Sequence, residues 1–108
     1  MALAAILRLE LSPPVDVVVV YDGSAALEAA SGSPAPHAVV LDIDMPLMTG
    51  IEAAAAIRRL PAGGPRTTLV AMSGDDNLLI GAERSGHFEA ILRKPIDMQR
   101  LLGLLRAA

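Results

Sequence analysis

Four short apolar runs, separated by segments of helical periodicity, constrain the fold of this chain more than any other feature. The runs cover residues 17–20, 38–41, 68–72 and 90–93. Unbroken apolar runs of this length are typical of strands that are buried on both faces. The helical patterns that alternate with them cover residues 24–30, 53–60, 77–85 and 98–105. This alternation predicts an open, doubly wound α/β fold, in which helices cover both faces of a parallel sheet.

Composition limits the chain to one domain over residues 1–108. Hydrophobic residues make up 53% of it, enough for a buried core, and the absence of cysteine excludes a disulfide framework, a cysteine-based zinc site and a thiol nucleophile. A net charge of -3 and an aromatic content of 2% argue against nucleic acid binding. No run approaches the ~20 apolar residues of a membrane span, and the N-terminus lacks a signal-peptide pattern. We therefore expect no membrane contact and a cytoplasmic location.

Three polar residues stand directly after strands of the predicted sheet. They are Asp42, Ser73 and Lys94. Because ligands of doubly wound folds bind at the carboxyl ends of the strands, we expect these three side chains to converge at one edge. A carboxylate nucleophile, a hydroxyl donor and an ammonium group together suit the transfer of a phosphoryl group to the carboxylate. Attack of one anion on another needs more positive charge, which is usually supplied by Mg²⁺ held by several oxygens.

Several ordered motifs carry a resemblance to one family. These motifs are YDGSAAL at 21–27, VVLDIDMPLMTG at 39–50, MSG at 72–74 and RKP at 93–95. Together they resemble the receiver domain of two-component response regulators, over essentially the whole chain. The resemblance implies a flavodoxin-like fold and a phosphorelay function, with a sensor histidine kinase or a histidine phosphotransfer protein as partner.

The resemblance also implies a role for individual residues. Asp42 corresponds to the phosphoacceptor, Ser73 to the switch hydroxyl and Lys94 to the lysine that pairs with the phosphoryl group. Lys94 precedes Pro95, whose peptide bond is expected to be cis. Asp44 would offer its backbone carbonyl, beside the carboxylate of Asp42, to Mg²⁺. Such a protein is a signalling domain and not a turnover enzyme.

The chain departs from the family pattern at its N-terminus. Family members begin with a central strand that ends in two acidic residues, which hold Mg²⁺, whereas this chain starts in what would be the following helix, a pattern seen at 2–10. We therefore predict a receiver domain that is incomplete at its N-terminus and lacks the acidic pair. A missing central strand would leave unpaired edges at 17–20 and 38–41. Direct pairing of these strands, recruitment of residues 2–9, or exchange with a second copy in a homodimer would close the gap.

Two other functions remain open from the sequence. The first is a receiver that is never phosphorylated and acts as a protein-docking module, which the absent acidic pair favours. The second is a phosphatase of the haloacid-dehalogenase type, because DIDMP at 42–46 is similar to the nucleophile motif of those enzymes. That motif continues with Thr or Val where this chain has Met45, and its metal-binding acids follow the lysine. Here Asp75 and Asp76 precede Lys94 and are predicted to cap the next helix.

Overall fold

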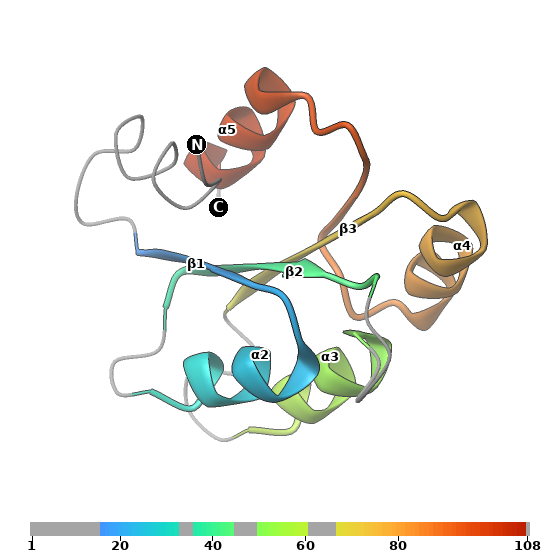
Figure 1. Ribbon diagram of the computed structural model, residues 1–108. Coiled ribbons are helices and arrows are strands. Elements are labelled where there is room, and N and C mark those ends of the chain that lie inside the picture. Colours follow the sequence, from blue (N-terminus) through green and yellow to red (C-terminus); the bar gives the residue numbers. More distant parts are fainter. Residues whose placement is uncertain (1–15, 33–35, 45–49, 61–66, 108) are drawn as a thin grey trace.

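The computed structural model describes residues 16–32, 36–44, 50–60 and 67–107. These residues form one sheet of four parallel strands in the order β1-β2-β3-β4, together with four helices (Figure 1). The strands are β1 (Val17–Val20), β2 (Ala38–Asp42), β3 (Thr68–Ser73) and β4 (Ala90–Arg93). The helices are α2 (Gly23–Ala30), α3 (Gly50–Arg58), α4 (Asp76–Ser85) and α5 (Met98–Ala107). The predicted alternation of strand and helix is confirmed, whereas the helix predicted at 2–10 lies outside the described residues.

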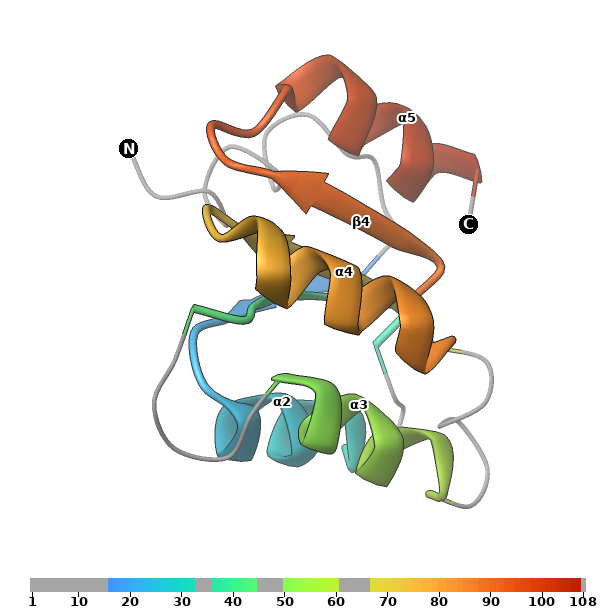
Figure 2. The same ribbon diagram turned by 90° about the vertical axis from the view of Figure 1, so that its right-hand side faces the viewer.

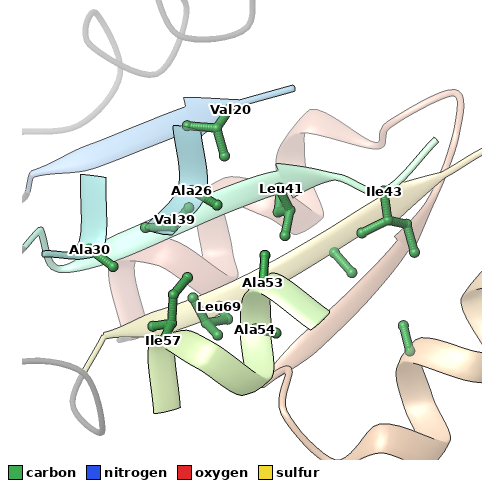
Figure 3. Close-up of a cluster of buried hydrophobic side chains, with 12 residues drawn as sticks. Val20, Ala26, Ala30, Val39, Leu41, Ile43, Ala53, Ala54, Ile57 and Leu69 are labelled. Atoms are coloured by element: carbon green, nitrogen blue, oxygen red, sulfur yellow. The ribbon is translucent and has the colours of Figure 1, made fainter. Parts of the chain in front are cut away.

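Helices cover both faces of the sheet, as the unbroken apolar runs predicted. Alternate residues of β2 point to opposite faces, so that Val39 and Leu41 pack with α2 and α3, while Val40 packs with α5. Figure 3 shows the first of these clusters between the sheet and the two helices. Figures 1 and 2 show α5 on the opposite side of the sheet from α2 and α3. The two central strands are therefore buried on both sides, which holds their carboxyl ends in fixed positions.

The gap that the sequence implied between residues 17–20 and 38–41 is closed by direct pairing. Strand β1 is hydrogen-bonded to β2 in parallel register, with Val17 opposite Ala38 and Val20 opposite Leu41. Of the three arrangements considered, this one needs neither residues 2–9 nor a second copy of the chain. Direct pairing, one of the three arrangements that the sequence left open, is therefore the one in this structure, and the facing edges of β1 and β2 are not free to pair with a second copy.

Aspartates begin three of the four helices. The side chain of Asp22 accepts a hydrogen bond from the backbone N–H of Ala25 at 2.7 Å, so Asp22 is the N-cap of α2. Asp75 caps α4 by accepting from the backbone of Asn77 and Leu78, and Asp97 accepts from the N–H of Arg100.

Within the described part of the chain, no helix has the length and apolar character needed to cross a membrane.

Candidate functional site

The sheet brings the three predicted residues together at its carboxyl edge. Asp42 and Ser73 are the last residues of β2 and β3, and Lys94 directly follows β4. The ammonium Nζ of Lys94 lies 2.8 Å from Oδ2 of Asp42, although 52 residues separate the two along the chain. The backbone N–H of Lys94 also donates to the carbonyl of Ser73 at 2.9 Å, which fixes the start of the lysine side chain beside β3. The peptide bond between Lys94 and Pro95 is cis.

A fourth side chain, the carboxylate of Asp44, lies at the centre of this cluster. It accepts hydrogen bonds from the hydroxyl of Ser73, from the backbone N–H of Gly74 at 3.0 Å and from Nζ of Lys94 at 3.0 Å. The sequence singled out only the backbone carbonyl of Asp44, so its carboxylate is a site residue that the sequence reasoning missed. The one available signal was a second acid two positions after Asp42, just beyond the strand end.

Backbone and hydroxyl contacts tie the site to its surroundings. Both carboxylate oxygens of Asp42 are occupied, because Oδ1 accepts from the backbone N–H of Asp44 at 2.9 Å and Oδ2 accepts from Lys94. The hydroxyl oxygen of Ser73 accepts from the backbone N–H of Asp75 at 2.9 Å. Ser73 is fully buried. Since Asp75 is the N-cap of α4, the hydroxyl of Ser73 connects the site directly to the start of that helix.

Opposite charges stabilise one another in the cluster. The hydrogen bond from the Ser73 hydroxyl, with those from Gly74 and Lys94, holds the pKa of the Asp44 carboxyl below its usual value. The hydrogen bond to Asp42, and the second one to Asp44, raise the pKa of the Lys94 ammonium. Both shifts favour the charged forms. Two carboxylates therefore share one ammonium group near neutral pH.

The lowered pKa of Asp44 predicts how stability depends on pH. Because the folded state favours the ionised carboxylate, its contribution is fully present above the unfolded pKa of about 3.9 and disappears as the pH falls through the lower folded pKa. We expect Asp44→Asn to lower the free energy of unfolding by about 1 kcal/mol at neutral pH, since the group is partly exposed to solvent.

Urea unfolding of both proteins across the acid range measures this difference. The difference in the free energy of unfolding should shrink toward zero at pH values where the Asp44 carboxyl group of the wild type is protonated in both the folded and the unfolded state. A difference that stays constant from neutral to strongly acidic pH would contradict an ionised Asp44 as its source.

The described residues do not by themselves form the Mg²⁺ site that the resemblance implies. Mg²⁺ is bound by oxygens, commonly one or two carboxylates together with water and phosphate. Asp42 and Asp44 supply two carboxylates, but both are already bound to Lys94. Across residues 16–32, 36–44, 50–60 and 67–107, no group of three or more metal-ligating side chains occurs.

The geometry of a carboxylate, a hydroxyl and a lysine at successive strand ends agrees with the family comparison. The model of the response regulator receiver domain matches residues 1–106. The chain belongs to the response regulator receiver domain family. It is thus a signalling domain of two-component systems, and the comparison gives no support to the haloacid-dehalogenase-type phosphatase.

Curated relatives of this receiver domain are longer proteins. The transcriptional regulatory protein PrrA of Mycobacterium tuberculosis, and likewise that of Mycobacterium bovis, is 32% identical to it over 92 residues. The match covers 85% of this chain and 38% of the relative. This chain therefore spans less than half the length of the curated relatives it matches.

Solved receiver structures share the fold. One of them is the receiver domain of the sensor histidine kinase PA1611 from Pseudomonas aeruginosa, which was solved with a magnesium ion in its active site cleft. It has a TM-score of 0.74 and 26% sequence identity to this chain, and the match covers 96% of this chain and 82% of that one. A response regulator protein from Burkholderia multivorans has a TM-score of 0.65 and 29% identity, covering 97% of this chain and 81% of that one. The flavodoxin-like fold predicted from the sequence is confirmed.

Proposed function

We propose that this receiver domain accepts a phosphoryl group on Asp42 from the phosphohistidine of a sensor kinase or a histidine phosphotransfer protein. The observation that carries the proposal is the contact between Asp42 and Lys94, at 2.8 Å, next to the Ser73 hydroxyl and the Gly74 N–H. These three donors are the groups that a phosphoryl group on Asp42 would need. The Asp42 side chain is mostly buried but keeps 14% of its surface exposed at the strand end, where a phosphodonor can reach it.

The transfer exchanges one phosphorus bond for another. A carboxylate oxygen of Asp42 forms the new O–P bond, and the P–N bond of the phosphohistidine breaks with its electron pair left on the imidazole nitrogen. The product is an acyl phosphate on Asp42 and a free histidine on the partner. Lys94 offsets the negative charge on the phosphoryl oxygens, and the Ser73 hydroxyl donates a hydrogen bond to one of them.

The signal leaves the site through the contacts of Ser73 and Lys94. The hydroxyl of Ser73 accepts from the N–H of Asp75, the N-cap of α4, so a hydroxyl that turns toward a phosphoryl oxygen alters the first turn of α4. Lys94 lies between β4 and α5 in the chain, so its movement alters the start of the segment that leads into α5. Phosphorylation then shifts the population of conformations that a partner recognises.

The domain would act as part of a cytoplasmic signalling pathway, with protein partners rather than nucleic acid. A net charge of -3 gives these residues no electrostatic attraction to a phosphate backbone. The curated relatives are named transcriptional regulatory proteins, and this chain covers 38% of their length. For this domain we propose only the receiving step and the surface change that follows it.

A docking module that is never phosphorylated is the second candidate. It is favoured by the carboxylate of Asp44, which already occupies the three donors, and by the two carboxylates that share one lysine. In that function Asp42 and Lys94 form a structural ion pair, and a partner binds whether or not Asp42 can react. The experiment below separates the two functions.

Intact mass after incubation with acetyl phosphate and Mg²⁺ tests the proposal. We expect the wild type to gain one phosphoryl group and Asp42→Asn to gain none. Asp76→Asn is the matched control, because it removes the same charge from an exposed carboxylate that pairs with Arg93 outside the cluster, and it should be phosphorylated like the wild type. An equal adduct on Asp42→Asn would contradict the assignment, and no adduct on any of the three proteins would favour the docking module.

A further inference from the structure

Three hydrogen-bond donors from two strand ends converge on the carboxylate of Asp44. They are the Ser73 hydroxyl, the Gly74 N–H and the Lys94 ammonium, and we call them the anion cradle. Oδ1 of Asp44 accepts from Ser73, while Oδ2 accepts from both Gly74 and Lys94. A neutral hydroxyl, an amide and a cation that face one point form a binding site for an oxyanion, and here an aspartate of the same chain fills it.

We propose that Asp44 is an internal competitor, whose carboxylate occupies the anion cradle in the resting domain and must leave before the cradle can hold a phosphoryl group on Asp42. This inference rests on the proposed function, because it assigns Asp44 a regulatory role at the same site. The competition follows from the number of donors. Ser73 and Gly74 each present one hydrogen here. The Gly74 N–H donates to Asp44, and the Ser73 hydroxyl lies much closer to Asp44 than to its other acceptor, the carbonyl of Asp75 at 3.4 Å.

The position of Asp44 allows its side chain both to bind and to leave. Its backbone N–H is held by Oδ1 of Asp42 at 2.9 Å, so the carboxylate is tethered next to the cradle at a high effective concentration. Its side chain is 32% exposed, whereas that of Asp42 is 14% exposed. Displacement would therefore release the carboxylate into water and not into the apolar core, which avoids the cost of a buried unpaired charge.

Charge prevents the carboxylate of Asp44 and a phosphoryl group on Asp42 from occupying the anion cradle together. The resting cluster holds two carboxylates and one ammonium. An acyl phosphate on Asp42 removes the carboxylate charge but brings a phosphoryl group of roughly -1.5 to -2. With Asp44 still bound, the like charges of the two anions would oppose each other across a few ångströms. Asp44 thus sets how readily Asp42 is phosphorylated, and its release accompanies the switch.

Two substitutions separate occupancy from charge. Both Asp44→Ala and Asp44→Asn remove the negative charge, but only alanine removes the oxygens from the cradle. We expect Asp44→Ala to raise the initial rate of phosphorylation by acetyl phosphate about fivefold, which matches a loss of roughly 1 kcal/mol of competing interaction. Asp44→Asn should lie between the wild type and Asp44→Ala, because its amide oxygen still accepts from Ser73. Asp76→Asn, which changes net charge equally, should leave the rate unchanged.

A second readout does not depend on the covalent step. Inorganic phosphate is titrated into each protein, and the amide signal of Gly74 is followed by NMR. The dissociation constant for phosphate should tighten in the same order, from wild type to Asp44→Asn to Asp44→Ala, by about fivefold overall. The spectra also show that each variant is folded, so a loss of binding through unfolding is recognised directly.

The outcomes distinguish this inference from the proposed function. Phosphate affinities in the expected order support Asp44 as a competitor, whether or not any protein forms an adduct. The absence of an adduct would reject only the phosphoacceptor function. A phosphoryl adduct on Asp42 with equal rates and equal phosphate affinities in all variants would overturn the competitor and leave the function standing. An effect of Asp44→Asn as large as that of Asp44→Ala would also overturn it, because charge alone would then explain the change.

Discussion

Lys94→Met lowers the rate of phosphoryl transfer to Asp42 by about 100-fold or more in our account. Nζ of Lys94 is the cation in contact with Asp42, at 2.8 Å, and it also binds Asp44 at 3.0 Å. Without it, no ammonium offsets the charge that develops on the phosphoryl oxygens, and the two carboxylates repel the donor. The rate is measured by intact mass over time with acetyl phosphate as donor.

Arg93→Met is the matched control for the lysine. Arg93 is the preceding residue, carries the same charge, and pairs with Asp76 in an exposed ion pair outside the cluster. It should be phosphorylated at nearly the wild-type rate. Methionine keeps much of the length of the lysine side chain, and the hydrogen bond from the backbone of Lys94 to Ser73 does not depend on the side chain, so both variants should stay folded. Equal slowing of both proteins would mean that only overall charge matters.

Gly50→Ala has the largest effect on stability that we expect from a single added methyl group. A Cβ atom at Gly50 would lie 2.1 Å from Cγ2 and 2.8 Å from Cβ of Ile43, which is itself almost fully buried. Figure 3 shows Ile43 at the end of β2, in the cluster beside α3. Because neither residue can move without shifting backbone, overpacking should cost about 1–3 kcal/mol in the free energy of unfolding.

Gly103→Ala shows what the same change does where there is space. Gly103 lies in α5, and a Cβ atom there would meet nothing within 4 Å. Alanine in a helix should then stabilise the protein by about 0.5–1 kcal/mol, because it restricts the unfolded chain. Urea unfolding measures both variants, and opposite signs are expected. A Gly50→Ala protein as stable as the wild type would contradict the close contact with Ile43.

The position of Gly50 also links stability to the site. Ile43 lies between Asp42 and Asp44, so a shift of Ile43 moves both carboxylates. We therefore expect the folded fraction of Gly50→Ala to be phosphorylated more slowly than wild type, whereas Gly103→Ala should not be. A folded-fraction rate equal to that of the wild type would show that the cluster tolerates this displacement.

The strands and the first three site residues were predictable because their signals are local. An apolar run marks a strand buried on both faces, and the polar residue after it marks the carboxyl end, whatever lies elsewhere in the chain. Asp42, Ser73 and Lys94 each follow such a run. Parallel strands then bring these ends to one edge without any further information.

The pairing of β1 with β2 was left open because the sequence does not specify which strands are neighbours. The family order placed a strand between them, and direct pairing was only one of three arrangements. The apolar runs at 17–20 and 38–41 could pair with each other or with a strand between them, because both consist of residues that favour buried strands. The register of Val17 with Ala38 follows from tertiary packing, which these runs do not encode individually.

The roles of Asp44 and Arg58 were not predictable because they depend on distant partners. Asp44 binds groups that lie 29, 30 and 50 residues away along the chain. In sequence, Arg58 is a cation near the end of a helix. In the structure its guanidinium donates to the carbonyls of Thr67 and His87 and forms an ion pair with Glu89. These contacts join α3 to the residues just before β3 and β4, and no local sequence pattern predicts them.

We propose that Asp42, and no other aspartate, receives the phosphoryl group. An acyl phosphate can be trapped by borohydride, which reduces the modified aspartate to homoserine, and tandem mass spectrometry then locates the reduced residue. After treatment with acetyl phosphate, we predict homoserine at position 42 in the wild type and in Asp44→Ala. Homoserine at position 44, or at any other aspartate in place of Asp42, would contradict the account.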